Sequence, residues 1–439
     1  MESIPAVEES HAADRSAHSI GRIVRLISAI ALLLFASLGT AKATTSPLRS
    51  PRGPACHGVR VAPGDDLRRL IDSHHRRSTF CFASGVYQLS GTVSTGSKFP
   101  RLDLRAGAVI DGQNGAFVGI NGADAPGDQR GAVILGGVFQ HFGNEAAPSW
   151  VSPVIVHRNW VVMGTEFKDN FNAGLGVQGD GARVSRVNTH HNGRYGLVVA
   201  QACAGCPGPA GVLIEDSEIA FNNTRQLSVV GDAGGTKFSG GTRGMIVRHN
   251  DVHDNYGSGL WWDTNNRNAK VYGNRIYNNR NCGILYETSF GGTTIHHNTL
   301  INNGIGDGTV DWTINVQLSI ASSDGSRGGR GGIEIYANTI AGDAYPLGLV
   351  THAGRPSTKQ VKVHDNVLVL RAVSSRVGGV DNSGTGEMFR PSAGNRFRAN
   401  TYRVLDRNAA YWAWNGETLT WAQWQALGHD GSGDVELIG

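Results

Sequence analysis

The chain has 439 residues, of which 61 are glycine and only 17% are charged, so it is long for one compact globule but suits many tight turns between short strands. Its formal net charge of +4 excludes the clustered basicity typical of nucleic-acid-binding proteins, and a mild basic excess is compatible with an acidic polymer as a partner.

The N-terminus has the features of a secretory signal. Two arginines precede an apolar run over residues 26–38, and an Ala-Lys-Ala sequence that ends at residue 43 offers a cleavage site. The run is shorter than the ~20 residues that a membrane-spanning helix needs, which favours cleavage over a retained anchor. We predict a signal peptide over 1–43, an exposed linker over 44–57, and a secreted protein, extracellular or periplasmic, without membrane attachment after cleavage.

All five cysteines follow the predicted signal, and an oxidising compartment would favour disulfides. Cys56 with Cys81 would staple the N-terminal segment, and Cys203 with Cys206 would close the loop around the sequence CAGC. A zinc site at CAGC is the weaker alternative, because no second cysteine pair or close histidine pair accompanies it. Cys282 sits inside a repeat and is predicted to be a small buried side chain.

Residues 58–100 are predicted to form an N-terminal cap together with the first strands. The sequence DDLRRLIDSHH, which starts at Asp65, places Leu67, Leu70 and Ile71 on one helical face. The alternating runs that follow are broken by glycine and are typical of strands. A short amphipathic helix laid over these strands would cover an open edge that otherwise invites aggregation.

Residues 245–304 contain one sequence unit written two and a half times. Its asparagines recur at intervals of 24 residues, and the unit extends in both directions with longer loops inserted. The aligned column reads Thr165, Val187, Ser217, Asn250, Asn274, Asn298, Asn338 and Asn366. A period in the twenties with short β-rich runs is typical of a solenoid, so we predict a parallel β-helix over 101–400. We interpret the asparagines as a structural ladder, since stacked amides can bond to one another along the axis.

The strand after each asparagine turn predicts two outward columns of side chains. Successive side chains of a strand point to opposite faces, so Leu260 and Trp262 are predicted to point inward. Trp261 and Leu285 then lie together in one outward column. The next outward column contains Gln178, Ala200, Asp263, Glu287 and His352.

Lys237, in the sequence GGTKF, is aligned with the second of these columns. The alignment places Lys237, Asp263 and Glu287 on consecutive rungs. Such a line could be a solvated charge ladder that favours pairing of adjacent coils. The neighbouring aromatic residues and long loops favour a functional site.

The last segment, 401–439, changes character and holds four of the nine tryptophans. TLTWAQWQALG predicts an N-capped short helix that ends at Gly428, with Trp421 and Trp424 on one face. An aromatic cluster at a chain end could bind sugar, but we interpret it as a C-terminal cap that covers the last coil.

The repeated I/V-x-x-N-x-I/V pattern, followed by G-I/L-x and an apolar or aromatic residue, resembles the right-handed parallel β-helix repeat of the pectate-lyase-like superfamily over roughly residues 60–400. GGTKF, GLWWDTNN, GILYE and LTWAQWQALGHD resemble secreted bacterial β-helix proteins of unassigned activity. The resemblance implies an all-β right-handed solenoid with a short N-terminal capping helix, an aromatic-rich C-terminal cap, and an outward groove for an extended polysaccharide. The superfamily includes lyases, hydrolases, epimerases, esterases, tailspikes and adhesins, so the fold does not choose among them.

Asp263 and Glu287 are candidates for the two carboxylates of a glycoside hydrolase. Equivalent atoms on adjacent rungs lie about 4.8 Å apart, and two like charges so close cannot both ionise cheaply. One pKa should rise, which gives an acid beside a base, and a separation of roughly 5 Å matches the retaining arrangement. Glu287 is the candidate acid and Asp263 the candidate nucleophile or base, with the two roles exchangeable at this stage.

The alternative is a polysaccharide lyase that acts on a uronate polymer. Lys237 would be the base at C5, and Asp263 with Glu287 could hold Ca²⁺ through oxygen ligands. Two carboxylates favour the charged form of Lys237, which opposes a role as base unless a metal offsets them.

Further side chains are candidates for substrate contacts. Trp261 could stack against a sugar ring, or it could be covered by the loops over 224–236 and 304–332. The other candidate contacts are His253, Asn265, Asn266 and His352. A third hypothesis is a non-catalytic carbohydrate-binding or surface β-helix protein. In each case we expect a polysaccharide partner, no nucleic acid, no protein-held metal other than a possible Ca²⁺, and a monomer.

Overall fold

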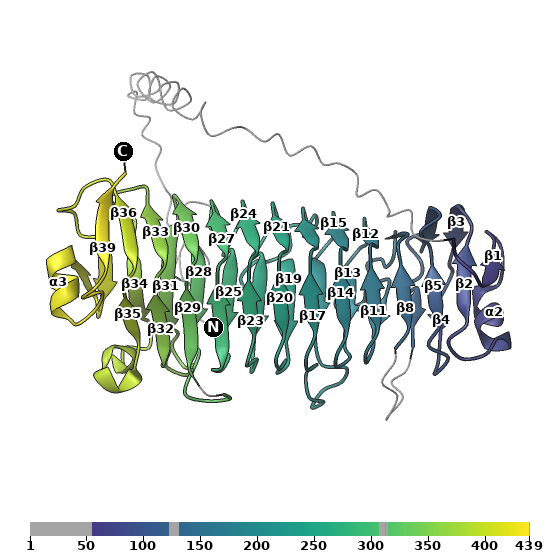
Figure 1. Cartoon of the computed structure of the whole chain (residues 1–439), viewed down its shortest axis with the longest axis horizontal. Coiled ribbons are helices and arrows are strands. Elements are labelled where there is room, and N and C mark those ends of the chain that lie inside the picture. Colours follow the sequence, from purple (N-terminus) through teal and green to yellow (C-terminus); the bar gives the residue numbers. More distant parts are fainter. Residues whose placement is uncertain (1–54, 123–130, 307–311, 313–314, 330, 439) are drawn as a thin grey trace, which may run out of the picture. The chain divides into compact units, whose positions relative to one another are not determined.

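The computed structural model describes residues 55–122, 131–306, 312, 315–329 and 331–438. These residues form a stack of coils in which successive coils add strands to three long sheets (Figure 1). The predicted signal peptide and most of the predicted linker lie outside the described residues. No helix in the described part of the chain is long and apolar enough to cross a bilayer.

Three sheets run along the stack, and we number them by the order in which one coil visits them. Sheet 1 contains β1 (Val59–Val61), β2 (Thr79–Phe82), β5 (Arg101–Asp103), β8 (Val133–Leu135), β11 (Val161–Met163), β14 (Arg183–Ser185), β17 (Leu213–Glu215), β20 (Ile246–Arg248), β23 (Lys270–Tyr272), β26 (Thr293–His296), β29 (Ile333–Tyr336), β32 (Val361–His364) and β35 (Arg396–Arg398). Sheet 2 contains β3 (Gly85–Gln88), β6 (Ala108–Asp111), β9 (Val138–Gln140), β12 (Glu166–Lys168), β15 (Asn188–His190), β18 (Glu218–Ala220), β21 (Asp251–His253), β24 (Arg275–Tyr277), β27 (Thr299–Ile301), β30 (Thr339–Gly342), β33 (Val367–Leu370), β36 (Thr401–Val404) and β39 (Asp434–Leu437). Sheet 3 contains β10 (Ile155–Val156), β13 (Ala173–Val177), β16 (Tyr195–Val199), β19 (Gly234–Ser239), β22 (Leu260–Asp263), β25 (Ile284–Glu287), β28 (Val316–Ala321), β31 (Tyr345–Thr351), β34 (Val377–Asp381), β37 (Trp412–Trp414) and β38 (Glu417–Leu419).

Neighbouring strands come from successive coils and pair in parallel, as the repeat predicts. A small fourth sheet pairs β4 (Val93–Ser94) with β7 (Ile120–Asn121), and β37 with β38 form an antiparallel hairpin. The structure therefore confirms the predicted all-β fold and parallel β-helix. Strands of this stack begin at β1 and end at β39, so the coils extend into both predicted caps.

The interior of the stack is filled by apolar side chains, which are those that the alternation of inward and outward residues along each strand predicts to point inward. Leu260 and Trp262 of β22 have no exposed surface and belong to one continuous core. The Trp262 ring packs edge-on against Phe238 of the preceding coil, with ring centroids 4.7 Å apart. Fully burying a side chain of this kind contributes about 1.5–3 kcal/mol, so each coil is stabilised by its neighbours on both sides.

Amide side chains form ladders at the turns. The predicted ladder is confirmed: the Nδ2 of Asn250 donates to the Oδ1 of Asn274 at 2.9 Å, and Asn274 donates in the same way to Asn298. This ladder continues through Asn338, Asn366, Asn400 and Asp430. A second ladder, between sheets 2 and 3, contains Asn170, Asn192, Asn222, Asn255, Asn279, Asn303 and Gln317. The ladders satisfy polar groups that would otherwise be buried without partners.

A short helix and a disulfide close the N-terminal end. Helix α2 (Leu67–Ser73) begins after Asp66, whose side chain accepts a hydrogen bond from the backbone N–H of Arg69. Leu67 and Ile71 of this helix join the core, as the amphipathic pattern predicts. In Figure 1, α2 lies beside β1 and β2 at the purple end of the chain.

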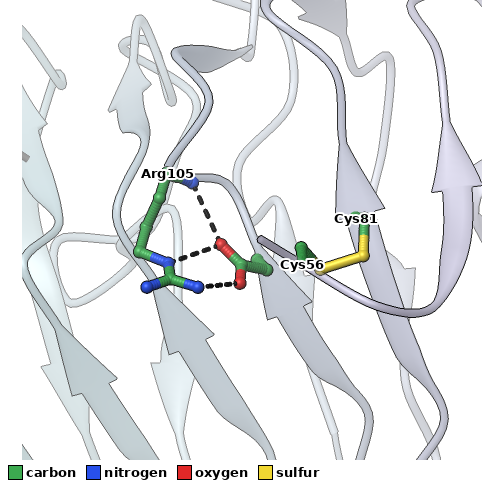
Figure 2. The surroundings of a disulfide bond; sticks show 4 residues. Cys56, Cys81 and Arg105 are labelled. Carbon is green, nitrogen blue, oxygen red and sulfur yellow. Dashed lines mark hydrogen bonds and ion pairs between the residues drawn. A yellow bond between two sulfur atoms is a disulfide. The ribbon is translucent and has the colours of Figure 1, made fainter. Parts of the chain in front are cut away.

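Both predicted disulfides are present. Cys56 and Cys81 are joined with their Cα atoms 5.8 Å apart, which ties the segment before β1 to β2. Figure 2 shows this bond near Arg105, which is itself held by a bidentate interaction with Asp103. Cys203–Cys206 closes the CAGC loop, which rules out the zinc alternative there. Cys282 is buried outside both disulfides, as predicted.

The C-terminal segment covers the last coil with aromatic side chains. Helix α3 (Trp421–Ala426) begins with a capping box between Thr420 and Gln423, and Trp424 is fully buried. Trp412 and Trp414 are buried in the same core, so these rings are not available to stack on a sugar. The cap interpretation is confirmed.

Candidate functional site

The candidate site lies on the outer face of sheet 3, over β19, β22 and β25. Asp263 and Glu287 are register partners on adjacent strands, as the repeat predicts. Lys237 does not share their column, because Ser239 pairs with Asp263 and Lys237 lies at the level of Trp261. The predicted alignment of Lys237 with Asp263 is therefore wrong by two residues.

The error has a simple physical cause. Shifting a strand by two residues leaves every side chain on the same face of the sheet, so alternation alone cannot exclude such a shift. The register of β19 is set by packing: Phe238 points inward at the level of Trp262, whose ring it contacts.

Lys237 nevertheless reaches Asp263 diagonally across the sheet. Its Nζ lies 2.9 Å from Oδ2 of Asp263 and 3.1 Å from the centroid of the Trp261 ring. The same ammonium donates to the carbonyl oxygen of Gly231 at 3.2 Å. The side chain of Lys237 is only 11% exposed, against 26% for Asp263, so the carboxylate is the more accessible member of the pair.

Glu287 carries the second carboxyl group and differs from Asp263 in its surroundings. Burial raises the pKa of Glu287, and the neighbouring Asp263 raises it further, while Lys237 lowers it. The indole Nε1 of Trp261 donates to Oε2 of Glu287 at 3.2 Å. Asp263 has an ammonium partner instead, so the adjacent carboxyl groups are in unlike environments, as an acid and a base require.

Burial also lowers the pKa of Lys237, although Asp263 and Glu287 oppose this effect. The two carboxylates alone would favour the charged form of Lys237, which is what we expected from the sequence. Desolvation outweighs them because the aliphatic stem and ammonium lie under a loop and over the Trp261 ring.

Trp261 is not a stacking platform for sugar. Only 1% of its surface is exposed, and it packs with Cys282, Leu285 and the partly buried Trp312. Trp312 comes from the insertion over 304–332, so the alternative that a loop covers Trp261 is confirmed. The indole instead supports Lys237 by a cation–π contact and orients Glu287 by a hydrogen bond.

Three charged residues beside the site, Arg194, Asp232 and Arg355, are absent from the sequence-based hypothesis. Arg194 forms an ion pair with Asp232, and the hydroxyl of Tyr195 donates to the same carboxylate at 2.5 Å. Burial raises the pKa of Tyr195 to about 12, Arg194 opposes the rise, and Asp263 adds to it. Arg355 lies on the other side, where its charge lowers the pKa of Glu287. Arg194 precedes β16, Asp232 precedes β19 and Arg355 follows β31. The sequence GRYG, at the start of β16, is the one sequence signal that could have pointed to Arg194.

Three of the candidate substrate contacts lie away from the carboxyl pair. His253 belongs to β21 of sheet 2, is 6% exposed, and stacks on Tyr277, so it lies on a different sheet from the carboxyl pair. Asn266 is fully buried and donates to the carbonyl oxygen of Phe238, which makes it part of a third ladder at the turn after sheet 3. That ladder contains Thr242, Asn266, Ser289, Ser323 and Thr358.

His352 is also misplaced by the sequence alignment. Glu287 pairs with Ala321, and Ala321 pairs with Val350, so Val350 is the residue of β31 that shares the column of Asp263 and Glu287. His352 follows the end of β31. The shift is again two residues, for the reason given for Lys237. Asn265 is exposed in the turn after β22, two residues beyond Asp263, and it stays a candidate contact.

The residues at the site do not fit Ca²⁺. The ion takes six to eight oxygen ligands, whereas Asp263 is occupied by an ammonium group 2.9 Å away. Within the described ranges, no group of three or more histidine, cysteine, aspartate or glutamate side chains could hold a metal ion. We therefore derive no step through calcium.

Comparison with known proteins agrees with this architecture. The profile of the family described as "Right handed beta helix region" matches residues 154–340. The chain is similar to the catalytic unit of a thermostable GH87 alpha-1,3-glucanase from Streptomyces thermodiastaticus strain HF3-3, with a TM-score of 0.57 and 13% identity, covering 88% of this chain and 70% of that chain. It is similar to XylC in complex with xylose, with a TM-score of 0.57 and 10% identity, covering 84% of this chain and 82% of that chain. No curated protein sequence matches it. The chain has the fold of a right-handed parallel β-helix.

Proposed function

We propose that the protein is a secreted glycoside hydrolase that cleaves a polysaccharide, with Glu287 as general acid and Asp263 as nucleophile. The observation that carries the proposal is the unlike pairing of two adjacent carboxyl groups. Asp263 contacts the Lys237 ammonium at 2.9 Å, whereas Glu287 is next to it in register without a cationic hydrogen-bond donor among the described residues. The rung spacing of about 4.8 Å is close to the ~5 Å of retaining glycosidases.

The proposed mechanism has two displacements. Glu287 protonates the glycosidic oxygen while Asp263 attacks the anomeric carbon, which breaks the bond to the leaving sugar and forms a glycosyl ester. Glu287, now a carboxylate, then takes a proton from water, whose oxygen attacks the anomeric carbon and releases Asp263. Lys237 supplies the counter-charge for Asp263, and Trp261 holds the orientation of Glu287.

A uronate lyase that uses Lys237 as base is the second candidate. The lowered pKa of Lys237, caused by burial, favours it. Two features favour the hydrolase: the Nζ of Lys237 already contacts Asp263 and Gly231, and its side chain is only 11% exposed. A non-catalytic carbohydrate-binding β-helix is the third candidate, because a charge-paired sheet face can hold a glycan without cleaving it.

The test is a panel of neutral and acidic polysaccharides, assayed with the wild type and with Glu287→Gln and Asp263→Asn. We expect wild-type cleavage without unsaturated products, and a loss of about 10²–10⁴-fold in kcat for each variant. Glu334→Gln, on the outer face of β29 in sheet 1, is a matched control that should keep full activity.

Each other outcome selects a different answer. Unchanged cleavage by both variants would sink the site assignment. Products that absorb as unsaturated uronates would select the lyase, since elimination leaves a C4–C5 double bond. Binding without cleavage across the panel would select the binding protein.

A further inference from the structure

The outer face of sheet 1 is hollowed over six consecutive strands, β5 to β20. A hollow of about 680 Å³ runs along the first residue of each of these six strands. A second hollow of about 400 Å³ adjoins it at Arg101, Val133 and Val161. We call the two joined hollows the arginine groove. Six residues along it are register partners on successive strands and therefore lie in one line across the sheet: Arg101, Val133, Val161, Arg183, Leu213 and Ile246.

The floor of the arginine groove is apolar where the alternation of a solvent-facing sheet predicts polar residues. Val133, Val161, Leu213 and Ile246 point away from the core and are partly exposed. In the later coils the same column is polar, with Lys270, Thr294, Glu334 and Lys362. A contiguous apolar strip confined to part of a polar face is typical of a contact surface.

The charged residues that line the arginine groove, within the described part of the chain, are all arginines. Arg101 and Arg183 are exposed, and the described residues offer neither of them a side-chain hydrogen bond or ion pair. The guanidinium of Arg186 donates to the sulfur of Met163 at 2.7 Å. Three carboxylates close to the lining residues in sequence are already engaged by other arginines: Asp103 by Arg105, Asp180 by Arg158 and Glu215 by Arg248. The groove therefore combines an apolar floor with guanidinium groups, whose planar donors match carboxylates.

We propose that the arginine groove binds an acidic polysaccharide, with carboxylates on Arg101 and Arg183 and the C–H faces of the sugar rings on Val133 and Val161. Six rungs extend over about 24 Å, which accommodates several sugar units in an extended chain. The groove lies on a different sheet from Asp263 and Glu287, so it is an additional binding site. It rests on the proposed function only for the choice of a carbohydrate as ligand.

A polysaccharide fits the groove better than a nucleic acid does. Single-stranded nucleic acids bind where aromatic rings stack on successive bases. Of the described residues that line the groove, Phe99 alone is aromatic. Aliphatic side chains flanked by guanidinium groups provide no series of stacking platforms, but they suit a ring that presents C–H groups and a carboxylate.

The test measures binding by calorimetry, with oligogalacturonate and oligomannuronate as acidic probes and a xylo-oligosaccharide of equal length as the neutral probe. All proteins carry Glu287→Gln, so that cleavage does not interfere. Arg101→Ala/Arg183→Ala should weaken binding of an acidic probe about tenfold or more, since it removes two guanidinium groups that form charge-assisted hydrogen bonds with carboxylates. Lys270→Ala/Arg396→Ala removes the same charge from the first residues of β23 and β35 in the same column and should leave affinity within about twofold.

The outcomes separate this proposal from the proposed function. Binding that depends on Arg101 and Arg183 supports the groove even if the wild type cleaves no glycan. Absence of binding by either acidic probe, equal losses in the two double variants, or equal affinity for the neutral probe would overturn it. Tighter binding of single-stranded DNA than of both acidic probes would overturn the choice of a carbohydrate.

Discussion

Lys237 and Asp263 form an ion pair of 2.9 Å although they are not opposite each other in the sheet. Ser239 occupies the position opposite Asp263, and the long side chain of Lys237 crosses the Trp261 ring to reach the carboxylate. This diagonal arrangement leaves Asp263 beside a cation and Glu287 beside an indole. It makes the two carboxyl groups chemically distinct, and it makes Lys237 the residue that best separates the candidate functions.

Replacing Lys237 by Met should change the pH dependence of activity. Lys237 lowers the pKa of Glu287, so its removal raises that pKa, and the alkaline limb of the kcat profile should move to higher pH. Lys237→Arg keeps the charge and should retain a profile close to that of the wild type. In the lyase alternative, Lys237→Met would abolish activity at every pH, so a measurable and shifted profile contradicts that mechanism.

Removing one amide from the asparagine ladder should destabilise the stack. Asn274 donates to the carbonyl oxygen of Val247 and to Asn298, and it accepts from Asn250. Asn274→Ala removes the acceptor of the buried Asn250 backbone N–H and the amide donor to the Val247 carbonyl oxygen, which we expect to cost about 2–4 kcal/mol in the free energy of unfolding.

The measurement is urea-induced unfolding, with Asn408→Ala as the matched control. Asn408 is exposed in a turn, so its replacement should change the stability by less than about 0.5 kcal/mol. Equal stabilities of the two variants would show that the ladder contributes nothing beyond backbone pairing.

The C-terminal cap should lose stability in mild acid. Burial lowers the pKa of His429 to about 4 from its ordinary 6.5, and its ring stacks on Trp424 with centroids 4.1 Å apart. The unfolded chain binds a proton below pH 6.5 and the folded chain only near pH 4, so stability falls as the pH decreases through this window. The full difference is about 3 kcal/mol.

Urea unfolding between pH 7 and pH 4 measures this effect. His429→Gln should flatten the pH dependence in that window, whereas His249→Gln, at a half-exposed surface histidine, should not. An unchanged slope in His429→Gln would mean that other groups account for acid sensitivity.

The disulfide between Cys56 and Cys81 should stabilise the N-terminal end. It closes a loop with a sequence separation of 25 residues, for which loop-closure entropy gives about 3.5 kcal/mol. Cys56→Ser/Cys81→Ser should lower the free energy of unfolding by that amount. Cys203→Ser/Cys206→Ser, which opens a separation of only 3, should cost less, and the reverse order would contradict the entropic account.

The sequence by itself determined the fold, the faces of the strands and the chemistry of the repeat. Asn250, Asn274 and Asn298 recur at a constant interval, and Leu260 with Trp262 alternate with polar positions, so coil length and inward faces follow from periodicity alone. The equivalence of Asp263 and Glu287 follows from the same repeat, because no insertion separates their coils.

Only the tertiary structure decided the register across insertions and the surroundings of each side chain. Lys237 and His352 were each misplaced by two residues, since a two-residue shift preserves the facing of every side chain and only the packing of Phe238 on Trp262 fixes the pairing of β19. The burial of Trp261 depends on Trp312 from a distant insertion, which no local pattern encodes. The arginine groove likewise exists only because stacking brings residues from six coils into one line.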